Sequence, residues 1–356
     1  MKIINQNGQI RIKDIAERAN VSIGTVDRVL HKRGEVSEAT KKKILKIIEE
    51  LDYKPNILAS TLASKKSLTF ATLLPKPPSP DGYWNKPLIG MHRAIDELKQ
   101  YGANLVSFSF AQDNSKEFYS EAKKIIELQP EGVVLAPFFY KESNLIVDEL
   151  KEKKIPFVFI DSNIEDAGQI GYIGQNSFQC GYLAGKLLDY IIPEKKSILV
   201  LHLAKEMDNQ NHLVQREKGF YEWFKINSNS THQVYTAESN DINDPVSYEK
   251  IIQVVKEKNI AGIFVTNSKV FLIGKLLKNS GMNQMKLIGH DLVKENIEYL
   301  KEGVVDFLIC QRPEEQGFNA ISKLFRHVVQ KENVANENYT SIDIITKENV
   351  DYYKEF

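Results

Sequence analysis

The stretch from Val21 to Leu30 carries side chains that could bind the edges of DNA bases. Ser22 is a favourable N-cap, because its hydroxyl can accept a hydrogen bond from a free backbone N–H group at a helix start. Three apolar residues recur at helical spacing on one face: Val26, Val29 and Leu30. Three polar residues point away from that face: Thr25, Asp27 and Arg28. We therefore expect one face of this helix to pack and the other to contact bases in a DNA groove.

Two neighbouring segments can hold this helix in place. Four apolar residues before it repeat at i, i+3, i+4 and i+7, which predicts another helix: Ile12, Ile15, Ala16 and Ala19. Only Asn20 to Ser22 separate the two helices, so the pair is predicted to be a helix-turn-helix. A third helix, capped by Ser37, places four apolar residues on one stripe: Ile44, Ile47, Ile48 and Leu51. Three helices can close a core that two short ones could not.

Residues 11–67, RIKDIAERANVSIGTVDRVLHKRGEVSEATKKKILKIIEELDYKPNILASTLASKKS, resemble the headpiece and hinge of the lactose-repressor (LacI/GalR) family of bacterial regulators. Members carry DVA-x-x-AGVS-x-x-TVSRVLN, then VS-x-x-TR, then the hinge Y-x-PN-x-x-A-x-x-L. The resemblance implies binding, as a homodimer, to a near-palindromic operator in double-stranded DNA. It also implies which residues contact DNA: Ser22, Ile23, Gly24, Thr25, Asp27, Arg28, His31, Asn56, Ala59 and Leu62.

The hinge follows Pro55, which cannot continue a helix. Residues 56–63 offer one or two turns of weak helix, too short to be stable alone in water. In the family this helix forms on DNA, pairs with its two-fold mate and inserts a Leu into the minor groove, and Leu62 falls on that position. The alternative is that Leu62 is buried against the rest of the chain.

Two residues depart from the family pattern. Arg11 stands where a capping Thr or Ser is usual, which should cost the first helix about 1 kcal/mol unless another group caps it. Asp27 replaces the Ser of TVSRV, and an acid beside phosphates should repel them. We favour a pairing of Asp27 with His31, four residues on, over a hydrogen bond from a cytosine amino group to Asp27.

The charge of the chain is unevenly distributed. Residues 1–66 hold 14 Lys and Arg against 8 Asp and Glu, whereas the remainder holds 33 against 39, so a net charge of +6 is joined to one of −6. A basic module on an acidic body is typical of a DNA-binding headpiece on a sensor. The cysteines, Cys180 and Cys310, form no CxxC and predict neither a disulfide framework nor a metal site. With no apolar signal region or membrane span, we expect a cytoplasmic protein, on the nucleoid when bound to DNA.

From residue 67 onward, apolar runs alternate with amphipathic stretches. Strands are predicted near 68–74, 104–109, 132–136, 156–160, 197–203, 232–236, 261–265, 286–289 and 306–310. Helices are predicted between them, among them 87–100, 116–128, 176–191, 214–225, 246–257, 269–279 and 313–330. Such alternation is typical of an α/β protein with doubly wound parallel sheets. Because roughly 290 residues exceed one core, two lobes are expected.

The body also resembles the sugar-sensing core of the same family, which is of the type I periplasmic-binding-protein kind. The similar segments are VFID at 158–161, YIGQNSFQCGYLAGKLL at 172–188, QREKGFYEWF at 215–224, IFVTNSKV at 263–270, LIGHDL at 287–292 and ICQRPEEQG at 309–317. The resemblance implies a headpiece at 1–54, a hinge at 55–66 and an effector-binding and dimerisation domain at 67–356. It places lobe 1 at about 67–173 and 312–334, and lobe 2 at about 174–311 and 335–356.

The same resemblance implies an effector site between the lobes, formed by Asp161, Arg216, Asn267, Asp291 and Gln311. Carboxylates, amides and a guanidinium suit sugar hydroxyls, since each presents donors or acceptors in a rigid plane. Trp84, in the loop PKPPSPDGYW, either stacks on a sugar ring or is a surface residue. Two acids against one base, with no glycine-rich loop for a phosphate, favour a neutral sugar or polyol. An acidic sugar held by Arg216 is the alternative.

Enzyme classes find little support. The chain contains no GxSxG, HExxH, GxxxxGK[ST] or GxGxxG, so the best-known hydrolase, metalloprotease and nucleotide motifs are missing. No cofactor is predicted. The sequence therefore predicts a sequence-specific transcriptional regulator, a repressor, controlled by a small carbohydrate-like effector. The alternatives are a sugar-binding protein of the periplasmic-receptor type without regulatory DNA binding, an activator responding to an acidic or phosphorylated sugar, and a sugar-acting enzyme.

Overall fold

A computed structural model describes residues 10–30, 33–51, 53, 67–77, 79, 82–203, 210–227, 230–239, 244–282, 284–334 and 337–353. The chain divides into two compact units, Met1–Ser64 and Lys65–Phe356. Within the described residues, no helix is long and apolar enough to cross a membrane.

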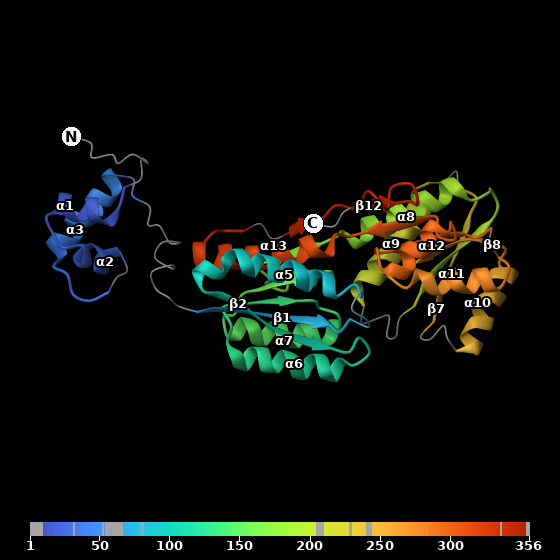
Figure 1. Cartoon of the computed structure of the whole chain (residues 1–356), viewed down its shortest axis with the longest axis horizontal. Coiled ribbons are helices and arrows are strands. Elements are labelled where there is room, and N and C mark those ends of the chain that lie inside the picture. The colour runs from blue at the N-terminus through green and yellow to red at the C-terminus, as the bar shows by residue number, and fades with distance from the viewer. Residues whose placement is uncertain are drawn as a thin grey trace. The chain divides into compact units, whose positions relative to one another are not determined.

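The first unit contains the predicted helix-turn-helix. Its helices are α1 (Ile12–Ala19), α2 (Ile23–Leu30) and α3 (Glu38–Glu50), shown in blue in Figure 1. Their buried core consists of Ile15, Ala16, Ala19, Val26, Val29, Ile44, Ile47 and Tyr53. Seven of these eight were predicted from helical spacing. The other predicted apolar residues are only partly buried and pack at the margin: Ile12, Leu30, Ile48 and Leu51.

Polar groups fix the ends of these helices. The Ser22 Oγ accepts a hydrogen bond from the Thr25 N–H at 3.1 Å, and the Ser37 Oγ accepts one from Thr40 at 3.3 Å, as predicted. At the start of α1, the Arg11 N–H donates to the Asp14 carboxylate at 2.8 Å. The acid in the first turn thus satisfies the Arg11 N–H and interacts favourably with the helix dipole, which offsets part of the expected loss.

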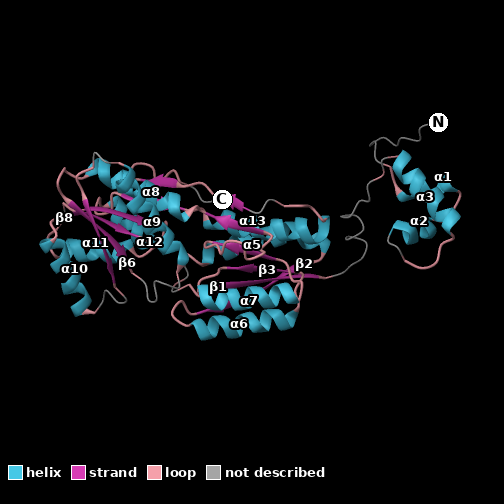
Figure 2. Cartoon of the chain, turned by 180° about the vertical axis from the view of Figure 1, so that it is seen from behind, coloured by secondary structure: helices cyan, strands magenta, loops and turns pink. Residues whose placement is uncertain are grey.

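The second unit begins with a six-stranded sheet, ordered β11-β5-β4-β3-β1-β2. Its strands are β1 (Leu68–Pro75), β2 (Ala103–Phe110), β3 (Gly132–Leu135), β4 (Phe157–Ile160), β5 (Gly171–Gly174) and β11 (Glu337–Tyr339). Two helices cover one face, α5 (Asn85–Leu98) and α13 (Pro313–Phe325), and two the other, α6 (Ser115–Leu128) and α7 (Tyr140–Glu152) (Figures 1 and 2). The short 3-10 helix η1 (Lys99–Tyr101) extends α5. This is lobe 1.

Lobe 2 repeats this plan around a second six-stranded sheet, ordered β12-β10-β9-β8-β6-β7. Its strands are β6 (Ser197–His202), β7 (Gln233–Glu238), β8 (Ile260–Val265), β9 (Lys286–His290), β10 (Phe307–Cys310) and β12 (Asp343–Ile345). Its helices are α8 (Ser177–Ile191), α9 (Asn211–Ile226), α10 (Pro245–Glu257), α11 (Val270–Asn279) and α12 (Lys294–Lys301). The predicted fold class is confirmed.

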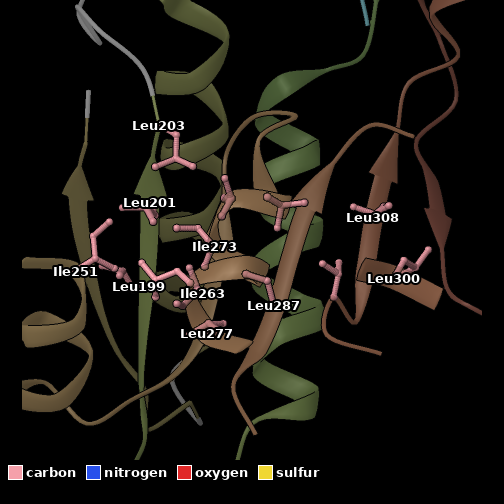
Figure 3. Close-up of a cluster of buried hydrophobic side chains, with 14 of the residues drawn as sticks. Leu199, Leu201, Leu203, Ile251, Ile263, Ile273, Leu277, Leu287, Leu300 and Leu308 are labelled. Carbon is pink, nitrogen blue, oxygen red and sulfur yellow. The ribbon is translucent and has the colours of Figure 1, made fainter. Parts of the chain in front are cut away.

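Alternate residues of the lobe 2 strands enter different cores. Leu199, Ile263 and Leu287 pack with residues of α10 and α11, and Figure 3 shows these side chains gathered between sheet and helices. The next residue along each of these strands faces α8 and α9 instead. These residues are Val200, Phe264 and Ile288, and they pack with Phe220. Strands covered on both faces read as continuous apolar runs, which explains why these strands could be predicted.

Three predictions about the body need correction. First, β12 pairs antiparallel with β10, so the second sheet is not wholly parallel. Second, the return into lobe 2 was placed at residue 335, but β11 still pairs with β5 in the first sheet, so the crossing falls between Tyr339 and Asp343. Third, α13 ends at Phe325 and continues as the π-helix η3 (Arg326–Gln330), whereas one helix was predicted through residue 330.

Candidate functional site

The residues predicted to bind an effector come together in one cavity between the lobes. It has a volume of about 260 Å³, and its lining includes all six of them: Trp84, Asp161, Arg216, Asn267, Asp291 and Gln311. Four of these follow the carboxyl ends of strands, where open α/β sheets bind their ligands. Asp161 comes directly after β4, Asp291 directly after β9 and Gln311 directly after β10.

The two aspartates end corresponding strands with the same backbone turn. Asp161 has φ 67° and Asp291 has φ 68°, both in the left-handed region that Asp tolerates better than most residues. Each N–H donates to a carbonyl of the neighbouring strand, to that of Ile173 at 3.4 Å and of Ile309 at 3.0 Å. Matched turns in the two lobes therefore present one carboxylate each to the cavity.

One amide group links these carboxylates. The Gln311 Nε2 donates to the Asp161 Oδ1 at 3.3 Å and to the Asp291 Oδ1 at 3.1 Å. The Gln311 Oε1 in turn accepts from the Gln316 Nε2 at 3.3 Å, which fixes the orientation of the amide. The Tyr83 hydroxyl donates to the Asp161 Oδ1 at 2.8 Å. An acid from each lobe is thus bound to the same nitrogen.

Arg216 supplies positive charge beside the two acids. Burial raises the pKa of Asp291 to about 7, while the nearby Arg216 opposes that rise and Asp161 adds to it. Burial also raises the pKa of Asp161, again against the lowering effect of Arg216. The guanidinium is 2% exposed and donates through Nη1 to the Thr266 carbonyl at 2.7 Å. Its buried Nε has no partner among the described residues, so a donor is left for a ligand.

Nine further lining residues were not found from the sequence: Tyr83, Gln112, Asp113, Phe138, Leu203, Gln210, His212, Ser268 and Lys269. Most come from loops that carry no motif. Asp113 and Lys269 add one acid and one base, so acids still outnumber bases by one. Burial lowers the pKa of His212 to about 3, so its ring is neutral.

Trp84 had two sequence interpretations, and the surface one is wrong. The side chain is 6% exposed and lines the cavity. Its ring meets that of Tyr83 edge to face, with centroids 5.0 Å apart and an interplanar angle of 88°. An aromatic wall beside planar amides and carboxylates suits a sugar ring, which has apolar C–H faces and hydroxyl edges.

Direct hydrogen bonds also join the lobes beside the cavity. The Lys86 Nζ of α5 donates to the Leu292 carbonyl at 3.0 Å, and the Asn211 Nδ2 of α9 donates to the Asn163 carbonyl at 3.2 Å. The cleft is therefore held shut by a few polar contacts.

The helix that carries Arg216 depends on a glycine for its position. A Cβ at Gly181 of α8 would lie 1.7 Å from the Arg216 carbonyl oxygen, far inside contact distance. Gly181→Ala should therefore destabilise the protein by about 1–3 kcal/mol and displace the guanidinium, weakening effector binding. Thermal unfolding followed with and without effector measures both effects. Gly24→Ala is the control, since its Cβ would meet only the Ser22 Oγ at 3.7 Å. Equal stability of the two variants would contradict the close packing.

The described part of the headpiece presents the predicted DNA-contacting face. Four of these residues are exposed, Ser22, Ile23, Gly24 and Arg28, and two are partly buried, Thr25 and Asp27. Ile23, an apolar residue, is 52% exposed, which fits a base-contacting position better than a packing one. The remaining predictions lie outside the described residues: His31 with its proposed Asp27 pairing, Asn56, Ala59 and Leu62.

Comparisons with known proteins agree with both units. A family of bacterial regulatory proteins, the lacI family, matches residues 11–56, and the periplasmic binding protein domain matches residues 71–332. A crystal structure from Bacteroides fragilis, assigned as a LacI transcriptional regulator, is similar at 32% identity with a TM-score of 0.74, covering 81% of this chain and 100% of that chain. The chain belongs to the lacI family of bacterial regulatory proteins.

Two more relatives of this lacI-family chain are informative. Catabolite control protein A of Streptococcus mutans is 27% identical over 201 residues, which span 53% of this chain and 58% of that protein. GanP, a glucose-galactose binding protein from Geobacillus stearothermophilus, is 22% identical with a TM-score of 0.71, covering 80% of this chain and 99% of that one. At this identity GanP shows only that the body shares its fold.

Proposed function

We propose that the chain is a DNA-binding transcriptional repressor, controlled by a small neutral sugar bound between its lobes. The observation that carries this proposal is the cavity. There Arg216 lies near one aspartate from each lobe, and the Gln311 amide links the two aspartates. A lacI-family helix-turn-helix on the same chain connects that site to DNA. The protein would act in the cytoplasm as a homodimer bound to the nucleoid. No catalytic step is proposed.

The cleft contacts supply a mechanism of control. A sugar that replaces Gln311 at the two carboxylates changes how strongly the lobes are held together. If the effector binds one lobe arrangement better than the other, it shifts their populations, and with them the geometry of the paired headpieces. A coupling of about 1–3 kcal/mol between effector and DNA is enough for a useful switch.

The effector class follows from the charges in the cavity. Three acids and two bases line it: Asp113, Asp161, Asp291, Arg216 and Lys269. The Lys269 Nζ already donates to the Leu203 carbonyl at 3.1 Å, which leaves Arg216 as the main group for an anion. A neutral sugar is therefore favoured, and the sugar-binding GanP has a body of this fold. An acidic sugar is the second candidate, because the Arg216 Nε has no partner among the described residues.

A thermal-shift screen of the full chain tests the effector class. We expect stabilisation by members of a panel of monosaccharides, disaccharides and sugar alcohols, and none by the matching sugar phosphates. Any hit should then change operator affinity in a fluorescence anisotropy titration. Tight binding of a phosphorylated sugar without affinity for its parent would overturn the proposed class.

The proposed dimer predicts a two-fold symmetric footprint. The described part of each chain contains one helix-turn-helix, so each headpiece should occupy one half-site of a near-palindromic operator. Footprinting of one unsymmetrical half-site bound tightly by a monomer would rule this out. A sugar-binding protein without DNA binding is the alternative, and it would give no footprint.

Two basic side chains should affect DNA binding differently. Arg28, exposed on α2, is proposed to read a base edge, so Arg28→Ala should cost about 1–3 kcal/mol and relax the base preference at one position. Lys42, exposed on α3, is the control, because Lys42→Ala should weaken binding to all sequences about equally. Selection from a randomised operator library distinguishes the two results. An unchanged base preference in Arg28→Ala would mean that another face of the headpiece enters the groove.

A further inference from the structure

A second cavity lies beside the first, next to the segment where the chain passes from β5 of lobe 1 to α8 of lobe 2. We call it the side cavity; its volume is about 240 Å³. Its lining comes from the loop after β4, from β5 through the first turn of α8, from the start of α9 and from β11: Ser162, Asn163, Glu165, Tyr172, Gln175, Asn176, Ser177, Phe178, Asn211, His212, Gln215 and Tyr339. None of these residues except His212 also lines the central cavity.

His212 forms the wall between the two cavities. Its Nδ1 is buried and has no hydrogen-bond partner among the described residues, which is costly for a polar atom. On the lobe 1 side, the centroid of its ring lies 6.4 Å from that of Phe138. The two cavities meet at this side chain. A ligand that passes His212 could then supply the missing partner.

The chemistry of the side cavity suits a neutral sugar unit. Three amides are held through one polar atom each: Asn163 and Asn176 through Oδ1, and Gln215 through Nε2. The other polar atom of each has no partner within the described residues. Aromatic rings of Tyr172 and Tyr339 meet edge to face at 6.1 Å in the same wall. Amides beside aromatic rings bind hydroxyls and C–H faces together.

The lining of the side cavity argues against an anion. Glu165 is its one charged residue, and neither Lys nor Arg occurs among the described residues that line it. A phosphate or carboxylate at this position would face a carboxylate without a counter-charge. Ser162, which is 4% exposed, contributes a hydroxyl directly after Asp161 of the central site. Neighbouring residues of the chain therefore line the two cavities.

Size gives an independent reason to combine the cavities. Ligand pockets usually have volumes of about 300–1,000 Å³. The central cavity, at about 260 Å³, is below that range, whereas the two cavities together reach about 500 Å³. We propose that the effector is a neutral disaccharide or similar glycoside, with one ring in the central cavity and the second unit in the side cavity, past His212. This inference rests on the proposed function and specifies its ligand.

Gln215→Trp tests the proposal by filling the side cavity from α9. The full-length protein would be titrated by calorimetry with glucose, galactose, maltose, cellobiose, lactose and melibiose. We expect wild type to bind at least one disaccharide at least about tenfold tighter than its component monosaccharides. Gln215→Trp should remove that gain and leave monosaccharide affinity unchanged. Lys218→Trp, at an exposed position of the same helix, is the matched control and should change neither affinity.

The outcomes separate this inference from the proposed function. Monosaccharide binding with no gain from a second ring would overturn the side-cavity proposal and leave the sugar-controlled regulator intact. An equal loss of both affinities in Gln215→Trp, absent in Lys218→Trp, would also overturn it, because the substitution would then act on the central site. If no sugar bound at all, both proposals would fail.

Discussion

Arg216→Ala is expected to abolish the response to the effector while specific operator binding persists. The guanidinium is buried near two carboxylates whose pKa it lowers, and its Nε, which has no partner among the described residues, is proposed to donate to the ligand. Hydrogen bonds to charged groups contribute about 1.5–3 kcal/mol each, so the loss of the bond from Nε should weaken effector binding by roughly 10- to 150-fold. Anisotropy of labelled operator DNA, titrated with effector, measures the response directly.

Two further variants make this result interpretable. Arg216→Lys keeps the positive charge but loses the planar fork of donors, so it should preserve folding and still bind effector poorly. Arg93→Ala removes an Arg of α5 that is 45% exposed and pairs with Glu314, and it should respond as wild type does. An Arg216→Ala protein that still released or recruited DNA on addition of effector would show that the switch lies elsewhere.

The headpiece was the part best predicted from the sequence. Its helices are short and amphipathic, so the spacing of Ile15, Val26 and Ile44 alone identified the core. The capping of α1 was predicted less well, because Asp14 acts through a reciprocal bond to Arg11 that no single residue indicates. The strands of the body were also found from their apolar runs. Six of the described strands are only three or four residues long, and three of them were missed: β5, β11 and β12.

The cavity was predicted in part. Asp161, Asp291 and Gln311 could be placed in one site from the sequence, because their segments resemble those that form the effector site of the family. The contacts between lobes could not be, because they join positions such as Lys86 and Leu292 that are far apart in sequence. His212 carries no motif either. Its place between two cavities follows only from how α9 packs.

Asp291→Asn is expected to stabilise the protein without effector at pH 8, by up to roughly 4 kcal/mol. Burial beside Asp161 raises the pKa of Asp291 from 3.8 to about 7. At a pH above both pKa values, a difference of that size lowers the stability of the folded protein by roughly 4 kcal/mol. Asn keeps the shape of the side chain and removes the buried charge. It loses effector binding as well, because the carboxylate is proposed to accept sugar hydroxyls. Urea unfolding at several pH values measures the gain.

The sign of the pH dependence is fixed by the direction of the pKa change. The folded protein holds a proton on Asp291 that the unfolded chain releases near pH 3.8, so this contribution to stability is complete below that pH. It is lost as pH rises toward about 7, where the folded carboxyl also ionises beside Asp161. Asp291→Asn should therefore flatten the wild-type decline in stability between about pH 4 and 7. Asp351→Asn, at a side chain 70% exposed, should leave that decline unchanged. If Asp291→Asn were no more stable than wild type at pH 8, the ionised Asp291 would have to be compensated within the folded cleft, by Arg216 or another group, as fully as it is by water in the unfolded chain.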